Sequence, residues 1–373
     1  MDRLVCTKCN EEFPLNEKIW RCKCGGLLDI DFRPTFPIDK IQQRKPTMWR
    51  YREAIPLFDD KNIISFDEGF TPLVEVDFNG KSVVIKQDYL FPTGSYKDRG
   101  ASVLISKVRE LGIRKVVEDS SGNAGSAIAG YCAKAKIDCE IFVPHNTSLG
   151  KLAQIQLYKA KLNKVPGSRE DTARAVLKGA EKYYYASHSW NPFFFHGTKT
   201  FAFEVCEQLG WKSPDSVVLP VGNGTLLLGA FIGFHELLEA GIIERIPRII
   251  AVQSVNCAPL YRAFKENLGE IPEIDKKDTL AEGIAIAKPI RGKHIIEAVK
   301  KSNGDFIVVD DFEIKRSLKD MCKRGFYIEP TAASTTAGIS KYVQESNPDE
   351  TIVSLFTGHG LKTPEKMLRV LNG

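Results

Sequence analysis

Short apolar, β-branched runs alternate with segments of helical periodicity along this 373-residue chain, and this alternation constrains the fold most. The runs predict strands at residues 73–76, 82–86, 115–118, 139–143, 216–221, 248–253, 306–309 and 351–356. Helices are predicted at residues 101–111, 123–135 and 226–240. From about residue 90 onward this order indicates an α/β protein with open parallel sheets covered by helices.

Composition narrows the class of protein. The hydrophobic content of 43% and charged content of 27% are ordinary for a globular protein, and the net charge of +5 gives no indication of nucleic-acid binding. No apolar run of about 18 residues predicts a membrane span. The first residues lack the apolar core of a signal peptide, so we expect a cytoplasmic protein. Five scattered cysteines are then expected to be reduced core residues: Cys132, Cys139, Cys206, Cys257 and Cys322.

The other four cysteines lie in the head of the chain, residues 1–34. Cys6 and Cys9 have two residues between them, and Cys22 and Cys24, which have one, follow after twelve residues. Four such thiolates can hold a structural zinc ion, which would supply folding energy to a segment with little core. A metal-free remnant of the same ribbon and a redox role remain alternatives, because two to four residues are usual within each pair.

Residues 92–100 read Pro-Thr-Gly-Ser-Tyr-Lys-Asp-Arg-Gly. Gly94 permits a sharp turn, and Ser95 is a favourable N-cap for the helix that follows. Lys97 is therefore predicted in the first helical turn, where the helix dipole favours the uncharged amine. A neutral amine is what Schiff-base chemistry requires.

This motif resembles the cofactor-lysine motif of the threonine synthase family. Other stretches resemble that family in the same order: residues 68–73, 120–123, 191–192, 197–200 and 357–362. The cysteine head resembles the ribbon of archaeal and some bacterial members. The resemblance implies a pyridoxal-phosphate-dependent enzyme of fold type II, like the tryptophan synthase β chain, and usually a homodimer.

The implied organisation has a zinc ribbon at 1–34, a large cofactor-binding domain at 35–95 and 191–373, and a small inserted α/β domain at 96–190. By the resemblance, Lys97 binds pyridoxal 5′-phosphate as a Schiff base and shuttles protons. The cofactor would lie between the two larger domains.

The remaining cofactor contacts come from three loops. The strand ending at 221 runs into Gly222, Asn223, Gly224 and Thr225, where glycines and a helix start suit a phosphate. The resemblance places Asn123 at the 3′ oxygen and Thr357 at the pyridine nitrogen, where a hydroxyl would make the cofactor a weaker electron sink than an aspartate would. The predicted substrate residues are Ser120, Ser121, Ser189, Asn191 and Lys199, the last being alternatively structural.

The implied reaction converts O-phosphohomoserine and water to threonine and phosphate. Two positions depart from the family: Phe194 replaces the usual arginine that grips the substrate phosphate, and Ala124 replaces a threonine. His196 or Arg169 could compensate. A serine/threonine dehydratase, or a β-replacement synthase using phosphoserine or an acetylated serine, therefore remains an alternative. A non-catalytic zinc-ribbon protein that binds a nucleic acid or a protein is disfavoured.

Overall fold

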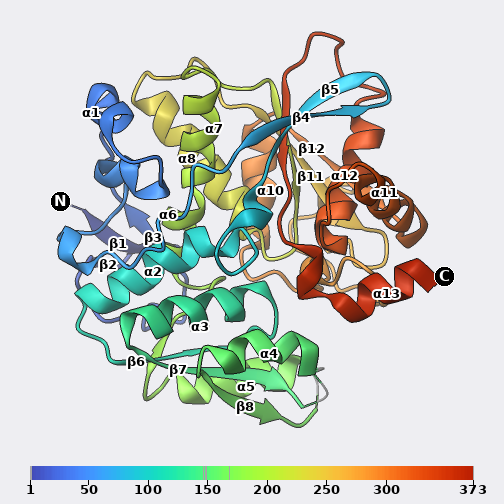
Figure 1. Ribbon diagram of the computed structural model, residues 1–373. Helices are drawn as coiled ribbons and strands as arrows, with labels where there is room; N and C mark the ends of the chain where they lie inside the picture. Colours follow the sequence, from blue (N-terminus) through green and yellow to red (C-terminus); the bar gives the residue numbers. More distant parts are fainter. Residues whose placement is uncertain (1, 146, 148, 168, 373) are drawn as a thin grey trace. The chain divides into compact units, whose positions relative to one another are not determined.

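The computed structural model describes residues 2–145, 147, 149–167 and 169–372 (Figure 1). The chain divides into two compact units: unit 1 comprises Met1–Gly69 and Lys97–Thr198, and unit 2 comprises Phe70–Tyr96 and Lys199–Gly373. Both contain a largely or wholly parallel sheet with helices, which is the expected α/β class. No helix in the described part of the chain is both long and apolar enough to cross a membrane.

Unit 1 is built around a four-stranded parallel sheet in the order β8-β7-β6-β9. Its strands are β6 (Lys115–Glu118), β7 (Asp138–Pro144), β8 (Lys161–Val165) and β9 (Tyr184–Tyr185). Its helices are α2 (Lys97–Glu110), α3 (Asn123–Ala135), α4 (Leu149–Leu157), α5 (Arg169–Gly179) and α6 (Pro192–Thr198). Helix α2 packs against both α3 and α6. These two contacts bring residues that are far apart in the sequence close to α2.

The head of unit 1 is a separate antiparallel sheet in the order β2-β1-β3. Its strands are β1 (Arg3–Cys6), β2 (Glu12–Pro14) and β3 (Leu28–Asp31), followed by α1 (Ile38–Gln43), η1 (Met48–Ala54) and η2 (Asp60–Asn62).

Residues 35–69 pack in unit 1, whereas the sequence placed them in the larger domain. Serines of α2 hold them there: Trp49 Nε1 donates to Ser102 Oγ at 2.9 Å, and the Ile64 amide donates to Ser106 Oγ at 2.8 Å. Such side-chain hydrogen bonds leave no periodic signal in the sequence.

Unit 2 contains a six-stranded sheet in the order β12-β11-β10-β13-β5-β4, parallel except for the β4–β5 hairpin. The strands are β4 (Leu73–Phe78), β5 (Lys81–Lys86), β10 (Ser216–Pro220), β11 (Arg248–Ser254), β12 (Asp305–Val309) and β13 (Ile352–Leu355). The α-helices are α7 (Thr200–Gln208), α8 (Thr225–Glu239), α9 (Pro259–Lys265), α10 (Gly292–Lys301), α11 (Asp311–Lys323), α12 (Pro330–Tyr342) and α13 (Pro364–Asn372). Single 3₁₀ turns are η3 (Asp88–Leu90), η4 (Glu282–Ile284) and η5 (Gly360–Lys362).

The two central strands of unit 2, β10 and β13, are buried along their whole length, as continuous apolar runs in parallel sheets are. They are neighbours and run in the same direction. The loops that follow them therefore leave the sheet at the same edge, where ligands of open α/β sheets usually bind. These two loops carry Gly222–Thr225 and Thr357.

Candidate active site

Lys97 is the first residue of α2, as the sequence predicted. Its side chain is half-buried, and Nζ lies 5.7 Å from the centroid of the Phe194 ring on α6. One turn further along α2, a Cβ on Gly100 would lie 2.3 Å from a Phe194 ring atom, so only glycine allows this packing. The position expected to hold a cation thus holds an aromatic ring beside the candidate catalytic lysine.

The predicted N-cap role of Ser95 is not found. Its hydroxyl is fully buried and has no hydrogen-bond partner among the described residues. Ser95 instead forms a β-bridge with Gly358 through its backbone, which ties it to the loop after β13 and not to the helix start. An unpartnered buried hydroxyl is uncommon in native proteins, and it leaves a donor for a ligand here.

Tyr96 links the two loops of unit 2. Its amide donates to the Thr357 carbonyl at 3.0 Å, and its hydroxyl lies 2.8 Å from Thr225 Oγ1. Because Tyr96 immediately precedes Lys97, the loop after β10 and the loop after β13 are both anchored to the residue next to the lysine. The structure in this way brings Thr225 and Thr357 together.

The loop from Gly222 to Gly224 is a tight cradle between β10 and α8. Gly224 has φ +75°, and a Cβ there would lie 2.4 Å from Ile295 Cδ1. A Cβ on Gly222 would lie 2.9 Å from the Ile284 backbone. No side chain caps α8, so amide donors of its first turn remain for an anion. This set of amide donors fits the phosphate of pyridoxal phosphate.

Thr357 follows β13 and is buried. Its Oγ1 donates a hydrogen bond of 2.9 Å to Oε1 of Glu329, which is also buried. Sequence reasoning missed Glu329. The available signal was an acidic residue directly before Pro330 at the start of an alanine-rich helix, where a free carboxylate is costly to bury.

In unit 1 the loop from Ser120 to Asn123 leads from β6 into α3, which begins at Asn123 as predicted. Ser120 Oγ accepts from the Gly122 amide at 3.3 Å, and no side chain caps the helix. A Cβ on Gly125 would lie 1.8 Å from the Ser120 carbonyl oxygen, so glycine is required for this close turn. Ser121 is half-buried in the same loop. These groups suit a carboxylate.

Two predicted substrate residues follow β9. Ser189 is buried, with its Oγ 3.3 Å from Ser187 Oγ. The Asn191 side chain has partners at both ends, since Nδ2 donates to the Tyr184 hydroxyl at 2.8 Å and Oδ1 accepts the Phe193 amide at 3.2 Å. Asn191 therefore holds β9 to the start of α6, which is a structural role.

Lys199 also has a structural partner. Its Nζ lies 2.7 Å from Glu236 Oε1 within unit 2, and both side chains are buried. Burial lowers the pKa of the Lys199 ammonium and raises the pKa of the Glu236 carboxyl to about 7. This geometry corresponds to the structural alternative for Lys199.

The structure adds a buried His188–Glu118 pair that sequence reasoning missed. His188 Nδ1 lies 2.6 Å from Glu118 Oε1, and the imidazole packs edge-on against Phe194 at 6.1 Å between ring centroids. His196 is buried against Phe32. The Arg169 side chain lies outside the described part of the structure.

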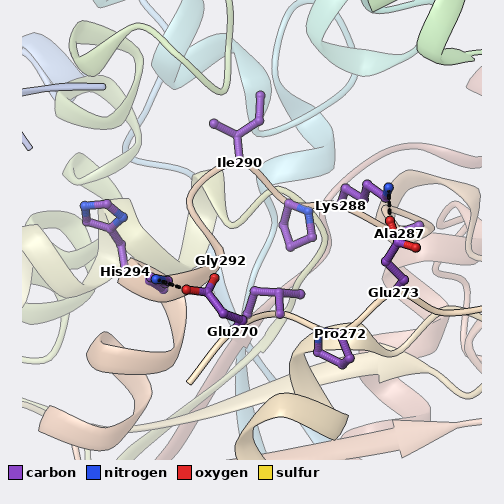
Figure 2. A pocket seen from close by; sticks show the side chains of 11 residues that line it. Glu270, Pro272, Glu273, Ala287, Lys288, Ile290, Gly292 and His294 are labelled. Atoms are coloured by element: carbon purple, nitrogen blue, oxygen red, sulfur yellow. Dashed lines mark hydrogen bonds and ion pairs between the residues drawn. The ribbon is translucent and has the colours of Figure 1, made fainter. Parts of the chain in front are cut away.

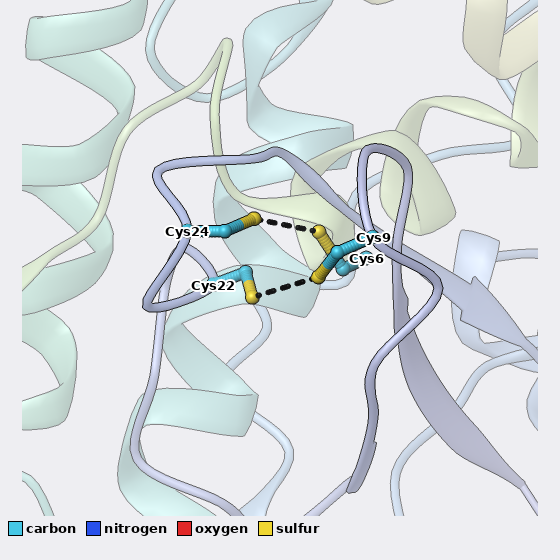
Figure 3. A group of neighbouring side chains, drawn as sticks. All are labelled: Cys6, Cys9, Cys22 and Cys24. Atoms are coloured by element: carbon cyan, nitrogen blue, oxygen red, sulfur yellow. Dashed lines mark hydrogen bonds between the residues drawn. The ribbon is translucent and has the colours of Figure 1, made fainter.

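The four head cysteines converge (Figure 3). All four Sγ atoms lie within 4.8 Å of one another, with 3.5 Å between Cys6 and Cys24 and 3.6 Å between Cys9 and Cys22. Zn–S bonds of about 2.3 Å at tetrahedral angles require Sγ separations of roughly 3.8 Å. Burial opposes ionisation of Cys6, but the amides of Cys9 and Lys8 outweigh it and lower the Cys6 pKa to about 7. The cluster fits a four-thiolate metal site.

A separate pocket of about 430 Å³ lies in unit 2 and is lined by parts of 270–273 and 287–294 (Figure 2). Lys288 pairs with Glu273 there, and Lys293 with Glu270. The lining residues include none of the residues predicted from sequence for the active site. The pocket is therefore distinct from the predicted cofactor and substrate groups.

Comparisons with known proteins show the family of the chain. The family model described as "Pyridoxal-phosphate dependent enzyme" matches residues 64–358. A threonine synthase of Methanocaldococcus jannaschii is 36% identical over 98% of this chain and 94% of its own length. A threonine synthase of Synechocystis is 32% identical over 87% of this chain and 86% of its own.

Solved structures show the same fold. Serine racemase from Dictyostelium discoideum superposes with a TM-score of 0.68 at 26% identity, covering 85% of this chain and 99% of that one. Threonine deaminase isoform 2 from Solanum lycopersicum superposes with a TM-score of 0.71 at 22% identity, covering 93% and 92%. The fold is that of type II pyridoxal-phosphate enzymes, and the sequence matches extend over nearly the whole chain. The chain therefore belongs to the pyridoxal-phosphate-dependent enzyme family and, within it, to the threonine synthases, which are lyases.

Proposed function

We propose that the protein converts O-phosphohomoserine and water to threonine and phosphate. One proton leaves the β carbon, the bond between the γ carbon and the phosphate oxygen breaks, and the γ carbon gains a proton. The hydroxyl of water adds at the β carbon, and the phosphate that leaves takes up the remaining proton of that water. The observation that carries the proposal is the placement of Lys97 at the start of α2, directly after Tyr96, which binds both Thr225 and the Thr357 loop.

Pyridoxal phosphate, when bound, supplies the electron sink that makes such an elimination possible. Lys97 would hold it covalently through its amine and move protons at the substrate carbons. The Gly222–Thr225 loop would bind its phosphate, Asn123 its 3′ oxygen, and Thr357 its ring nitrogen. Ser120 and Ser121, with the uncapped start of α3, would bind the substrate carboxylate.

Phe194 and Ala124 affect which substrate the site can accept. Both side chains are buried, and neither can pair with a phosphate dianion. His188 packs against Phe194 and is hydrogen-bonded to Glu118, so it is the cationic candidate that the structure adds. If no cation serves, the favoured second function is a serine or threonine dehydratase, which needs no phosphate clamp.

Two experiments test this proposal. Borohydride reduction of the holoenzyme followed by peptide mapping should place the cofactor label on Lys97; a label elsewhere would reject the lysine assignment. Purified enzyme is then assayed side by side on O-phosphohomoserine, serine, threonine and phosphoserine. Threonine with stoichiometric phosphate supports the proposal, whereas preferential release of ammonia and a keto acid from serine or threonine supports the dehydratase.

The proposal includes a structural zinc ion bound by Cys6, Cys9, Cys22 and Cys24, supported by their mutual distances. Four thiolates leave no open coordination position, so the metal would stabilise the head and take no part in the chemistry. Elemental analysis should find about one zinc per chain. It also includes a homodimer, which light scattering of the purified protein tests.

A further inference from the structure

The cysteine head of unit 1 packs on residues 184–191, which we call the substrate segment because predicted substrate residues lie in it. Trp20, two residues before the second cysteine pair, is buried. Its ring lies edge-on to Tyr185, with 5.0 Å between ring centroids and 84° between ring planes. It lies edge-on to Trp190 in the same way, at 5.4 Å and 85°. Trp20 thus contacts the substrate segment near both of its ends.

The substrate segment has little regular structure of its own. Its strand β9 has two residues, each paired with β6, and residues 186–191 are in neither a helix nor a strand. Stretches of this kind depend on tertiary packing for a fixed conformation. One support comes from the domain itself, since the Tyr185 hydroxyl donates to Asp119 at 2.7 Å. The other comes from the head, through Trp20.

The place of Trp20 depends in turn on the cysteine cluster. Residues 15–21 are in neither a helix nor a strand, and this loop is held at its ends by β2 and by Cys22. Cys22 belongs to the four-thiolate cluster, where its Sγ lies 3.6 Å from that of Cys9. A metal ion bound by the cluster would therefore fix the backbone two residues from Trp20.

We propose that Trp20 is a positioning residue, through which the metal-binding head keeps the substrate segment in the conformation that binds the substrate. The inference rests on the proposed function, which puts Ser189 and His188 of this segment at the substrate. Because Trp20 acts through Tyr185 and Trp190, it affects the binding of substrate and leaves the chemistry on the cofactor unchanged.

The test combines steady-state kinetics with amide hydrogen exchange, which requires neither cofactor nor substrate. Trp20→Leu keeps a large apolar side chain and removes both edge-on contacts. We expect the Ala186 and Asn191 amides, both hydrogen-bonded in the structure, to exchange faster by roughly 5- to 150-fold, the effect of losing two aromatic pairs. KM for O-phosphohomoserine should rise by up to the same factor, while kcat and the borohydride labelling of Lys97 stay unchanged. Removing the metal with a chelator should give the same pattern.

Two variants serve as controls. Trp20→Phe keeps a ring that can lie edge-on, so it should restore most of the protection and most of the affinity for substrate. Phe306→Leu removes a buried aromatic pair of unit 2, formed with Phe264 at 5.1 Å between ring centroids. It should lower the melting temperature and change neither KM nor exchange in the substrate segment. A rise of KM in Phe306→Leu as large as in Trp20→Leu would contradict a specific role for Trp20.

The outcomes separate the inference from the proposed function. An enzyme that makes threonine, and whose KM and exchange are the same in Trp20→Leu, overturns the inference and leaves the function intact. If the unmodified enzyme does not use O-phosphohomoserine, the proposed function fails, and exchange together with KM for the substrate that it does use decides the inference separately. Should Trp20→Leu not fold, the unmodified protein is treated with a chelator below its melting temperature. Exchange in the substrate segment that stays as slow as with the metal then overturns the proposal.

Discussion

The buried Lys199–Glu236 pair allows a decisive test of whether Lys199 is structural. Lys199→Met leaves the Glu236 carboxyl buried without its cation, and breaking a buried pair in this way costs about 3–5 kcal/mol. For a unit of this size, each kcal/mol lowers the melting temperature by about 2–4 °C, so a decrease of roughly 6–20 °C is expected. Lys199→Met combined with Glu236→Leu removes both charges and should restore most of that loss.

The assay is thermal unfolding of the four proteins of this double-mutant cycle, with KM measured for each. The matched control is Lys265→Met, because Lys265 forms a 2.6 Å pair with Asp305 at the surface, where about 0–1 kcal/mol is expected. A Lys199→Met variant as stable as the control would refute the burial argument. A double variant of normal stability with KM raised tenfold or more would instead make Lys199 a substrate residue.

The same variant has a predictable pH dependence. Burial raises the Glu236 pKa from 4.5 to about 7 in the folded protein, so the folded state binds this proton more tightly than the unfolded state does. A carboxyl group whose pKa is raised on folding contributes least to the stability of the folded protein when it is ionised. The loss of unfolding free energy in Lys199→Met, relative to the unmodified protein, should therefore be small near pH 4.5 and grow as the pH rises through 7. A deficit independent of pH would show that lost packing, and not the carboxylate, is responsible.

Three further outcomes follow from the site. Removing zinc with a chelator, or Cys6→Ser, should lower the melting temperature while borohydride labelling of Lys97 persists; loss of labelling at temperatures where the protein stays folded would contradict a purely structural metal. Gly224→Ala should cost about 1–2 kcal/mol because of its left-handed backbone, and should weaken cofactor retention measured by dialysis. His188→Gln should raise KM for O-phosphohomoserine more than for serine if His188 serves the phosphate; equal changes would exclude that role.

Much of the framework could be predicted because it depends on periodicity. The helix at 123–135 has the bounds expected from its apolar pattern, and the buried strands β10 and β13 were evident as continuous apolar runs. The two-residue strand β9 was missed, because two tyrosines give no detectable alternation. The place of residues 35–69 was also not predictable, since polar contacts to Ser102 and Ser106 determine it.

The candidate site could be predicted where a motif is contiguous and not where a residue acts through a distant partner. Lys97, Asn123 and the Gly222–Thr225 loop each lie at a strand–helix junction that the sequence shows directly. The partner of Thr357 is Glu329, 28 residues away on another element, and only the fold brings them together. The expected cap by Ser95 was wrong: its backbone forms a bridge with Gly358, and its buried hydroxyl makes no hydrogen bond to the helix start.

Phe194 stands where the family usually has an arginine, and a comparison of motifs alone does not show the full effect of this difference. The Phe194 ring is fully buried, lies against Gly100 where no Cβ fits, and packs on His188. An arginine there would have to occupy the same closely packed space, so the difference from the family is one of packing as well as of charge. The ring also faces Lys97 at 5.7 Å, within the range in which an aromatic face stabilises a cation. Replacing Phe194 would therefore remove a contact of the lysine itself, as well as change the affinity for a phosphate.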